Sequence, residues 1–474
     1  MSSFRSPLAI SCGSTSAAPE RLSLRETLRA SPRLAERRLW GAEASVALAD
    51  IAHGTALGGA LPALAGRSVL LRTRDPLAAA LALIELDGVA RRIVLCPPDL
   101  SEAALQGVIE TAAVDALASD EAPSEITAGL GLARIALPLK SLIETPDPAF
   151  DTEWVMFTSG TSGPPKMVVH TLGGLSGAIR PADPSAPPPV WGTFYDIRRY
   201  GGLQILLRGL LGEGSLAITA PSEPMADFLV RLGRLGVTHV TGTPSHWRSV
   251  LMRPEAAAIH PAYVRLSGEI ADQSVLDALK VRYAGVPVGH AYASTEAGVG
   301  FEVTDGLEGF PASFVGRPGD VEMRVADGVL QLRSSRTSGG YLNPDAAPLF
   351  DADGFVDTGD MVELRGERYH FVGRRGGVIN VGGLKVHPEE IEAVINSHPA
   401  VRMSLVRGRR NPFTGAIAVA EVVLNDGAPD ETALKSEILE ICRRELAPFK
   451  VPASLKFAAS LAMTAGGKLE RALA

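Results

Sequence analysis

The chain has 474 residues, a formal net charge of -7 and a hydrophobic content of 46%. This length is too great for one compact core, so at least two domains are expected. The mild acidity argues against a nucleic-acid-binding protein, because binding to a phosphate backbone requires a basic face. The three cysteines, Cys12, Cys96 and Cys442, are far apart, which predicts neither a disulfide framework nor a zinc cluster.

The N-terminal segment 1–26 has no apolar run of signal-peptide length. The most apolar tract, residues 45–66, is interrupted by Asp50 and His53, so it is not typical of a membrane span. We therefore expect a soluble, cytoplasmic protein without a stable membrane anchor.

The first half of the chain alternates short apolar runs with alanine-rich stretches. Residues 68–71 and 92–96 predict strands, and residues 76–86, which begin with a proline, predict a helix. A helix followed by a strand returns at residues 228–240. Strands that alternate with helices predict the α/β class, with a mostly parallel sheet covered on both faces.

The pattern changes at about residue 319. Residues 321–333 alternate around Asp327 and Gly328, which is typical of a β-hairpin, and residues 351–373 continue in the same style. This part of the chain predicts a β-rich subdomain with tight turns.

A second change follows Gly373, where a glycine-rich segment precedes a helix that begins at Pro388. Strands at 401–407 and 416–424 and a helix at 431–446 are expected after it. We therefore predict a large N-terminal domain of layered α/β subdomains plus the β-rich subdomain. A small, mobile α+β C-terminal domain follows it. The predicted domains cover residues 1–372 and 373–474.

The stretch FTSGTSGPPKM at 157–167 has a composition typical of phosphate-binding loops. A Walker loop requires a serine or threonine after its lysine and then a helix, but Met167 and β-branched residues follow Lys166. The spacing predicts strand, loop and strand, which disfavours a Walker-type NTPase or kinase. Backbone N–H groups, hydroxyls and Lys166 can still bind a polyphosphate. The alternative is an ordinary glycine-rich linker.

This loop resembles the T-S-G-T-T-G-x-P-K signature of the adenylate-forming superfamily, which contains acyl-CoA ligases, amino-acid adenylation domains and luciferases. Four further motifs of the superfamily have counterparts in the same order. They are YASTE at 292–296, FVDTGD at 355–360, the segment 373–392 and TAGGKLER at 464–471. The resemblance covers the chain from about residue 67 to its end. It implies an enzyme that uses ATP, Mg²⁺ and coenzyme A.

The resemblance also implies roles for single residues. A carboxylate that attacks the α-phosphate of ATP approaches a polyanion, so cations and oriented donors must offset the repulsion. Lys468 matches the family's catalytic lysine, and Glu296, after Thr295, matches its magnesium ligand. The implied phosphate-binding residues are Thr158, Ser159, Gly160, Thr161, Ser162, Gly163 and Lys166.

Nucleotide-binding residues are implied in the same way. Asp360 matches the carboxylate that accepts from both ribose hydroxyls, and Arg374 matches a second ribose contact. Gly268, Glu269 and Tyr292 resemble the strand and the aromatic residue beside adenine. Without the resemblance, Asp360 would be interpreted as a turn residue and Tyr292 as part of the core.

The superfamily performs two half-reactions with one site by rotating its small domain, which needs a few residues that absorb a large change in φ and ψ. The hinge position falls on Gly376, where relatives carry Asp or Lys, and Gly382 and Gly383 would line the channel for the thiol. Further departures from the family pattern are Pro164, Ala293 and Asn380. None of them removes a group that the first half-reaction needs.

For the acid pocket, Tyr195 and Asp196 can be aligned with the Phe-Asp pair of amino-acid adenylation domains, whose aspartate binds an ammonium group. Arg198 and Arg199 follow directly and are more natural partners for Asp196 or for an acidic substrate. The sequence therefore leaves the acid open.

The predicted function is that of an ATP-dependent acid–thiol ligase. It forms acyl-AMP from a carboxylic acid, releases pyrophosphate and passes the acyl group to coenzyme A. Coenzyme A is the expected acceptor because no fused carrier domain follows the last motif, and a homodimer is possible. One alternative loads a free phosphopantetheine carrier protein. Another is a non-catalytic nucleotide-binding relative, which the retained Lys468, Glu296 and Asp360 disfavour.

Overall fold

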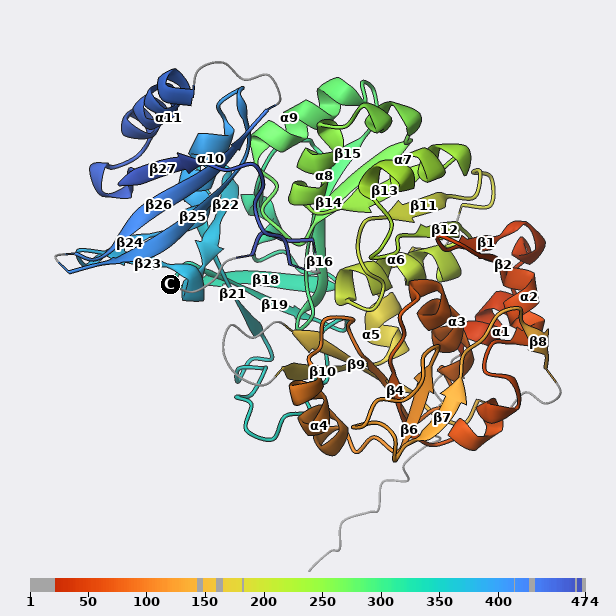
Figure 1. Cartoon of the computed structure of the whole chain (residues 1–474). Helices are drawn as coiled ribbons and strands as arrows, with labels where there is room; N and C mark the ends of the chain where they lie inside the picture. The colour runs from red at the N-terminus through yellow and green to blue at the C-terminus, as the bar shows by residue number, and fades with distance from the viewer. Residues whose placement is uncertain are drawn as a thin grey trace, which may run out of the picture.

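Four large β-sheets, with helices packed between and around them, organise the chain in the computed structural model (Figure 1). The structure describes residues 22–142, 148–158, 165–180, 183–412, 414–425, 431–464 and 467–470. The first two sheets contain most of the red-to-green elements of Figure 1, and the fourth sheet lies in the blue part. The predicted α/β class, with a large N-terminal part and a small C-terminal part, is confirmed.

The largest sheet has eight strands and is mostly parallel, with antiparallel strands at its two edges. Its strands, in spatial order, are β16 (Gly298–Val303), β15 (Val288–Ser294), β14 (Tyr263–Ser267), β13 (His239–Gly242), β11 (Val190–Thr193), β12 (Ser215–Ile218), β1 (Arg38–Trp40) and β2 (Ser45–Ala47). The helices that follow its strands are α6 (Tyr200–Leu211), α7 (Met225–Arg234), α8 (Pro244–Leu251) and α9 (Gln273–Arg282). This sheet provides the strand ends that carry most of the candidate site.

The second sheet has seven strands, and its central strands are parallel. In spatial order they are β20 (Gly340–Tyr341), β10 (Lys166–His170), β9 (Glu153–Thr158), β5 (Arg92–Leu95), β4 (Ser68–Leu71), β6 (Ala116–Ser119) and β7 (Gly131–Arg134). The helices associated with this part are α1 (Leu24–Arg29), α2 (Leu48–His53), α3 (Pro76–Leu86), α4 (Glu102–Thr111) and α5 (Leu172–Ser176). The strands predicted at 68–71 and 92–96 and the helix at 76–86 are confirmed.

Helix α3 is the most deeply placed helix of this part, because all of its residues are buried. It begins in the predicted way: Pro76 occupies the first turn, and the Asp75 side chain accepts from the Leu77 N–H at 2.9 Å. A helix that is apolar on every side requires protein around its whole circumference. It belongs to a large apolar core that also includes residues of β4, β5 and α6.

The third sheet contains five antiparallel strands and corresponds to the predicted β-rich subdomain. In spatial order they are β17 (Phe310–Pro311), β22 (Arg368–Arg374), β21 (Val356–Arg365), β19 (Val329–Ser334) and β18 (Val321–Ala326). The predicted turn between β18 and β19 is present, with φ angles of +51° at Asp327 and +74° at Gly328. Positive φ at both central residues suits a tight hairpin turn, which explains the Asp-Gly pair.

The fourth sheet forms the C-terminal part and has a separate apolar core. Its strands are β24 (Leu384–Val386), β23 (Ile379–Val381), β26 (Gly415–Leu424), β25 (Val401–Asn411) and β27 (Ser454–Phe457), with helices α10 (Pro388–Asn396) and α11 (Glu431–Glu445). Strand β22 of the third sheet ends at Arg374, and β23 begins at Ile379. The domain boundary between residues 372 and 373 stays a prediction.

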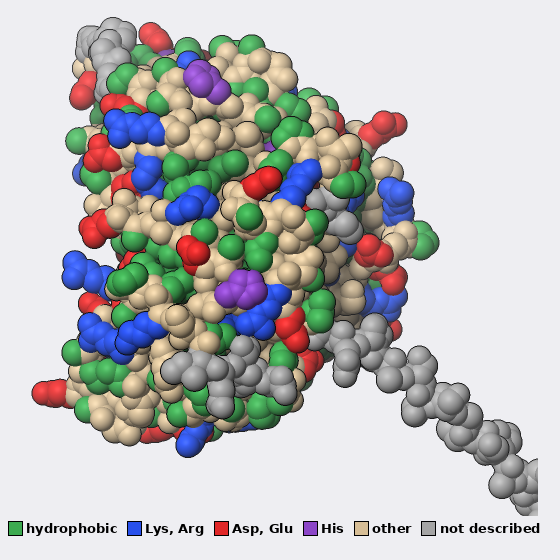
Figure 2. All heavy atoms as spheres, turned by 90° about the vertical axis from the view of Figure 1, so that its right-hand side faces the viewer, with side chains coloured by type: hydrophobic (Ala, Val, Ile, Leu, Met, Phe, Trp, Pro, Cys, Tyr) green, Lys and Arg blue, Asp and Glu red, His purple; other side chains and the backbone are tan. Residues whose placement is uncertain are grey.

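The remaining elements are short. Strands β3 (Gly54–Thr55) and β8 (Lys140–Ser141) pair with each other, and single 3-10 turns occur at Leu34–Glu36, Gly58–Leu64, Pro254–Ala258, Ala312–Phe314, Arg375–Gly377 and Pro448–Lys450. Figure 2 shows the face around the N-terminal elements, where basic and acidic side chains are interspersed with apolar ones. Within the described ranges, no helix combines the length and the apolar character needed to cross a bilayer.

Candidate active site

The predicted site residues come from all four sheets, or from segments beside them, and from a C-terminal loop. Strands β14 and β15 are parallel neighbours, so the segments that follow them, with Gly268 and Glu296, leave the sheet at the same edge. Carboxyl ends of parallel strands are the usual place for a ligand in such a sheet. Strands β21 and β22 supply Asp360 and Arg374, which are paired in register.

Asp360 lies at the centre of a hydrogen-bonded cluster. The Tyr292 hydroxyl donates to its Oδ2 at 2.5 Å, and Arg374 Nε donates to its Oδ1 at 2.9 Å. The Asp360 N–H donates to Thr358 Oγ1 at 3.1 Å, and Gly359 turns the chain with a φ of +70°. Each carboxylate oxygen has a second lone-pair direction, so the carboxylate can still accept from a ligand.

The ring of Tyr292 is held between two phenylalanines. Its centroid lies 5.5 Å from that of Phe301 and 5.3 Å from that of Phe371, with interplanar angles of 15° and 8°. Burial and the adjacent Asp360 carboxylate raise the Tyr292 pKa well above its ordinary value, so the hydroxyl remains a donor. The Tyr292 hydroxyl reaches the site through its hydrogen bond to Asp360. Its predicted contact with adenine stays a prediction.

Lys468 reaches this region from the C-terminal part of the chain. A β-carbon added at Gly268 would lie 3.4 Å from Lys468 Cε and 4.0 Å from Nζ, so glycine leaves room for the lysine stem. Lys468 is exposed to solvent, although protein atoms crowd its charged group. Partial desolvation lowers its pKa, Glu269 and Asp360 oppose this, and Arg374 and Arg199 add to it.

Two hydrogen bonds hold the backbone on either side of Lys468. Thr243 Oγ1 donates to the Gly467 carbonyl at 2.7 Å, and the Leu469 N–H donates to Glu269 Oε1 at 3.1 Å. The structure thus places Glu269, which was predicted near adenine, against the lysine segment. Thr243 lies at the start of α8, and no motif indicated that it contacts the lysine segment.

His170 and Tyr341 contact the segment Thr295–Glu296 and hold it in place. His170 Nε2 lies 2.7 Å from the Thr295 carbonyl and donates to it, and burial lowers the His170 pKa to about 4, which keeps the ring neutral. The Tyr341 hydroxyl lies 3.4 Å from Glu296 Oε1, and Lys166 Nζ lies 5.2 Å from the centre of the Tyr341 ring. Sequence reasoning missed His170 and Tyr341, because no motif contains either of them.

The predicted phosphate loop joins two antiparallel strands, as expected. Thr158, the last residue of β9, pairs with Lys166, the first residue of β10. Asn343 holds the second half of this junction: its Oδ1 accepts from the Met167 N–H at 2.7 Å, and its Nδ2 donates to the Pro165 carbonyl at 3.2 Å. The predicted phosphate-binding residues Ser159, Gly160, Thr161, Ser162 and Gly163 lie outside the described residues.

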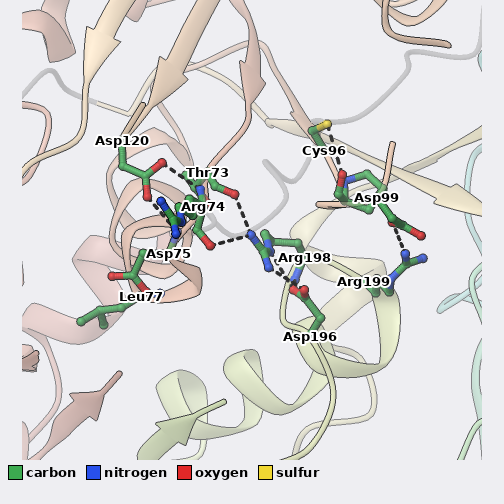
Figure 3. Close-up of polar contacts among 11 residues, drawn as sticks. Thr73, Arg74, Asp75, Leu77, Cys96, Asp99, Asp120, Asp196, Arg198 and Arg199 are labelled. Carbon is green, nitrogen blue, oxygen red and sulfur yellow. Dashed lines mark hydrogen bonds and ion pairs between the residues drawn. The ribbon is translucent and has the colours of Figure 1, made fainter. Parts of the chain in front are cut away.

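A small cavity lies between α6 and β14, and Tyr195 lines it together with Tyr200, Gln204, Arg265, Ser267 and Val299. Asp196 is not among its lining residues. Its two carboxylate oxygens accept from Arg198 Nε at 2.8 Å and from Nη2 at 2.6 Å, and Arg198 also donates to the Thr73 carbonyl at 2.6 Å (Figure 3). Arg198 is 2% exposed, so this pair is structural and Asp196 is not free for a substrate ammonium.

The remaining predicted residues lie in the C-terminal part. Gly376 belongs to the 3-10 turn between β22 and β23, and a side chain added there would meet no atom within 4 Å. Gly382 and Gly383 form the turn between β23 and β24 with φ angles of +61° and +88°. The Gly383 N–H donates to Asn380 Oδ1 at 2.9 Å. Their roles as hinge and thiol channel stay predictions.

Comparison with known proteins places this arrangement in a family. The model of the AMP-binding enzyme family matches residues 69–340, and the model of the AMP-binding enzyme C-terminal domain matches residues 390–468. A 2-succinylbenzoate–CoA ligase from Listeria innocua is 29% identical over 338 residues, which are 68% of this chain and 69% of that protein. A ligase of the same name from Bacillus cereus is 29% identical over 344 residues, 67% of this chain and 68% of its own.

Solved structures show the same fold. An anthranilate CoA ligase in complex with anthranoyl-AMP superposes with a TM-score of 0.80 at 18% identity, covering 95% of this chain and 96% of its own. The o-succinylbenzoate CoA synthetase from Bacillus subtilis in complex with its acyl-adenylate intermediate gives a TM-score of 0.74 at 21% identity, covering 94% and 96%. The family-model match over residues 69–340, which is more than half of the chain, establishes that the chain belongs to the AMP-binding enzyme family.

Proposed function

We propose that this enzyme is an AMP-forming acid–CoA ligase whose acid carries a second anionic group. A carboxylate oxygen attacks the α-phosphorus of ATP, and the bond to pyrophosphate breaks. The sulfur of coenzyme A then attacks the acyl carbon, and AMP leaves. The observation that carries the proposal is the approach of Lys468 to Gly268, beside the cluster of Tyr292, Asp360 and Arg374.

Lys468 supplies the positive charge that the first step needs. Attack of an anion on a polyphosphate is slowed by charge repulsion, and a cation held beside the reacting atoms lowers that barrier. Asp360 accepts from the ribose and so fixes the nucleotide, while Tyr292 and Arg374 fix Asp360. The contribution of positioning is large in such reactions, because correct orientation replaces a search in solution.

Glu296 is the residue that would hold Mg²⁺. No group of three or more Asp, Glu, His or Cys side chains able to hold a metal ion occurs in the described part of the chain. Mg²⁺ does not require one, because it commonly binds one or two carboxylates together with phosphate oxygens and water. When bound, the ion would neutralise phosphate charge. His170 and Ser338, which bond to the backbone of Thr295 and Glu296, would keep the Glu296 carboxylate in place.

The second anionic group of the acid is inferred from an excess of positive charge beside the cavity. Gln204 lines the cavity from α6, and Arg208 lies one turn further along the same helix face. The Nε atom of Arg208 is buried and has no hydrogen-bond partner among the described residues. Burial, with Arg265 nearby, lowers the Arg208 pKa to about 10. The nearby Glu302 already forms an ion pair with Arg265 at 3.1 Å.

A buried arginine, Arg265, and a half-buried one, Arg208, therefore share one carboxylate next to the acid pocket. Removing a charge from water is costly unless an opposite charge accompanies it, so an anionic ligand group is the natural third partner. The name 2-succinylbenzoate, carried by the relatives, denotes an acid with two carboxyl groups, which fits this requirement. The Asp196–Arg198 pair weighs against an amino-acid substrate.

Acid-dependent ATP–pyrophosphate exchange tests the proposal. We expect 2-succinylbenzoate to support exchange and 4-oxo-4-phenylbutanoate, which lacks the ring carboxylate, to do so at least tenfold less well. Arg208→Met should reduce this difference, whereas Arg282→Met, on the exposed face of α9, should leave it unchanged. Equal rates for the two acids would refute the anionic requirement, and no exchange with any acid would refute the ligase.

The acceptor is tested on the same protein. Coenzyme A, or a carrier protein with its phosphopantetheine arm, is added to enzyme that has formed acyl-AMP, and thioester is measured by mass. Coenzyme A is the proposed acceptor because the relatives are named CoA ligases. If thioester formed on the carrier protein and not on coenzyme A, the free carrier protein would be the acceptor.

A further inference from the structure

The described C-terminal segment 467–470, called here the lysine loop, makes contacts that the proposed chemistry does not itself require. Two of its residues contact the large domain: Gly467, just before Lys468, bonds to Thr243, and Leu469, just after it, bonds to Glu269. Backbone hydrogen bonds on both sides of a residue restrict the direction in which its side chain can extend. Here that direction leads past Gly268 toward the Asp360 cluster.

The two contact groups belong to one rigid corner of the large domain. Thr243 caps α8: its Oγ1 accepts from the His246 N–H at 3.1 Å, and the Thr243 N–H donates to His246 Nδ1 at 3.1 Å. Glu269 binds the same helix end through its Oε2, which accepts from the Ser245 N–H at 3.0 Å. The N-terminal end of α8 therefore holds both groups through contacts that do not involve the lysine loop.

Gly467 fits this corner because it has no side chain. Its φ is +70°, and an added β-carbon would lie 1.9 Å from the His246 ring. The His246 ring cannot easily move, since it also stacks on Phe194 at a centroid distance of 5.6 Å. Its Nδ1 accepts the Thr243 N–H, and burial lowers the His246 pKa to about 4, so the ring stays neutral at the pH of an ordinary assay.

We infer that Thr243 and Glu269, beside the His246 ring, form a dock for the lysine loop that is specific to the adenylation half-reaction. They are positioning residues, because they act through Lys468. Each contact is a single, partly buried hydrogen bond, and such bonds are individually modest. The dock can therefore hold the loop for the first step and release it when the small domain moves for the second. This inference rests on the proposed function.

The decisive variant is Gly467→Ala, which should drive the loop off the dock. We expect ATP–pyrophosphate exchange to fall at least tenfold, while transfer of the acyl group from supplied acyl-AMP to coenzyme A stays within about twofold. Replacing the ring by His246→Ala in the same chain should restore most of the exchange. Gly366→Ala is the matched control: its φ is +59°, but an added β-carbon meets nothing within 4 Å.

Thr243→Val removes the bond to Gly467, and Thr243→Ser keeps it. With valine we expect about a threefold to tenfold loss of pyrophosphate exchange, which corresponds to the loss of one hydrogen bond. With serine we expect near-normal exchange. Valine also removes the α8 cap, so the thermal unfolding temperature of both variants is measured. A loss of exchange without a loss of thermal stability indicates that the dock is weakened and the helix is intact. A fall of both half-reactions together, or failure of His246→Ala to rescue Gly467→Ala, would overturn the dock.

A readout without catalysis separates the dock from the ligase activity. Amide hydrogen exchange at Leu469, whose N–H is bonded to Glu269, should be faster in Gly467→Ala and near normal in the double variant. If no acid supported pyrophosphate exchange, the ligase proposal would fail while this measurement still decided the dock. Unchanged exchange at Leu469 in Gly467→Ala would refute the dock directly.

Discussion

Tyr292→Phe tests the link between the aromatic stack and nucleotide binding. The substitution removes only the hydroxyl, and the stack between Phe301 and Phe371 is kept. The lost bond, 2.5 Å long, runs to the Asp360 carboxylate, and a hydrogen bond to a charged group contributes roughly 1.5–3 kcal/mol. Asp360 keeps its bond to Arg374 and can take up water, since its side chain is 16% exposed. We therefore expect the lower end of that range.

About 1.5 kcal/mol corresponds to roughly tenfold in affinity. The predicted outcome is a KM for ATP about ten times higher in the pyrophosphate-exchange assay, with kcat changed little, because the hydroxyl orients the ribose acceptor in both ground and transition states. Tyr283→Phe is the matched control, since the Tyr283 hydroxyl makes only a 3.4 Å contact to the Ala256 carbonyl, remote from the site. An unchanged KM in Tyr292→Phe would refute the assigned role of Asp360 and its support.

Three further predictions concern other parts of the molecule. Lys468→Ala should abolish ATP–pyrophosphate exchange and leave thioester formation from supplied acyl-AMP largely intact; if both steps fell together, the assigned role of the lysine would be wrong. Gly376→Pro should slow thioester formation more than adenylation, and equal effects in the two half-reaction assays would contradict a hinge there. His170 has a pKa of about 4 when folded and an ordinary value of 6.5, so acid favours the unfolded state. The contribution of neutral His170 to the free energy of unfolding is complete above pH 6.5. It falls by about 3 kcal/mol in total as the pH is lowered to 4. His170→Gln should flatten this part of the dependence of the urea midpoint on pH, and identical profiles would contradict it.

The sequence by itself determined the local elements and the family. Hydrophobic periodicity and the residues that begin helices or form turns were sufficient to predict β4, α3 and the β18–β19 hairpin. Pro76 and the Asp327–Gly328 pair act on the backbone within a few residues. The strands predicted on either side of residues 159–164 are present for a similar reason: the β-branched residues after Lys166 favour a strand over a helix.

Only the tertiary structure decided which of the candidate residues meet. Asp196 carried a substrate-binding hypothesis, but its position two residues from Arg198 allowed a bidentate ion pair that closes it off. Glu269, expected beside adenine, binds the backbone of Leu469, two hundred residues further along the chain. Thr243, His170 and Tyr341 lie in no motif and become relevant through contacts that strand order and domain packing create. Contacts of this kind depend on long-range packing, which local sequence patterns do not encode.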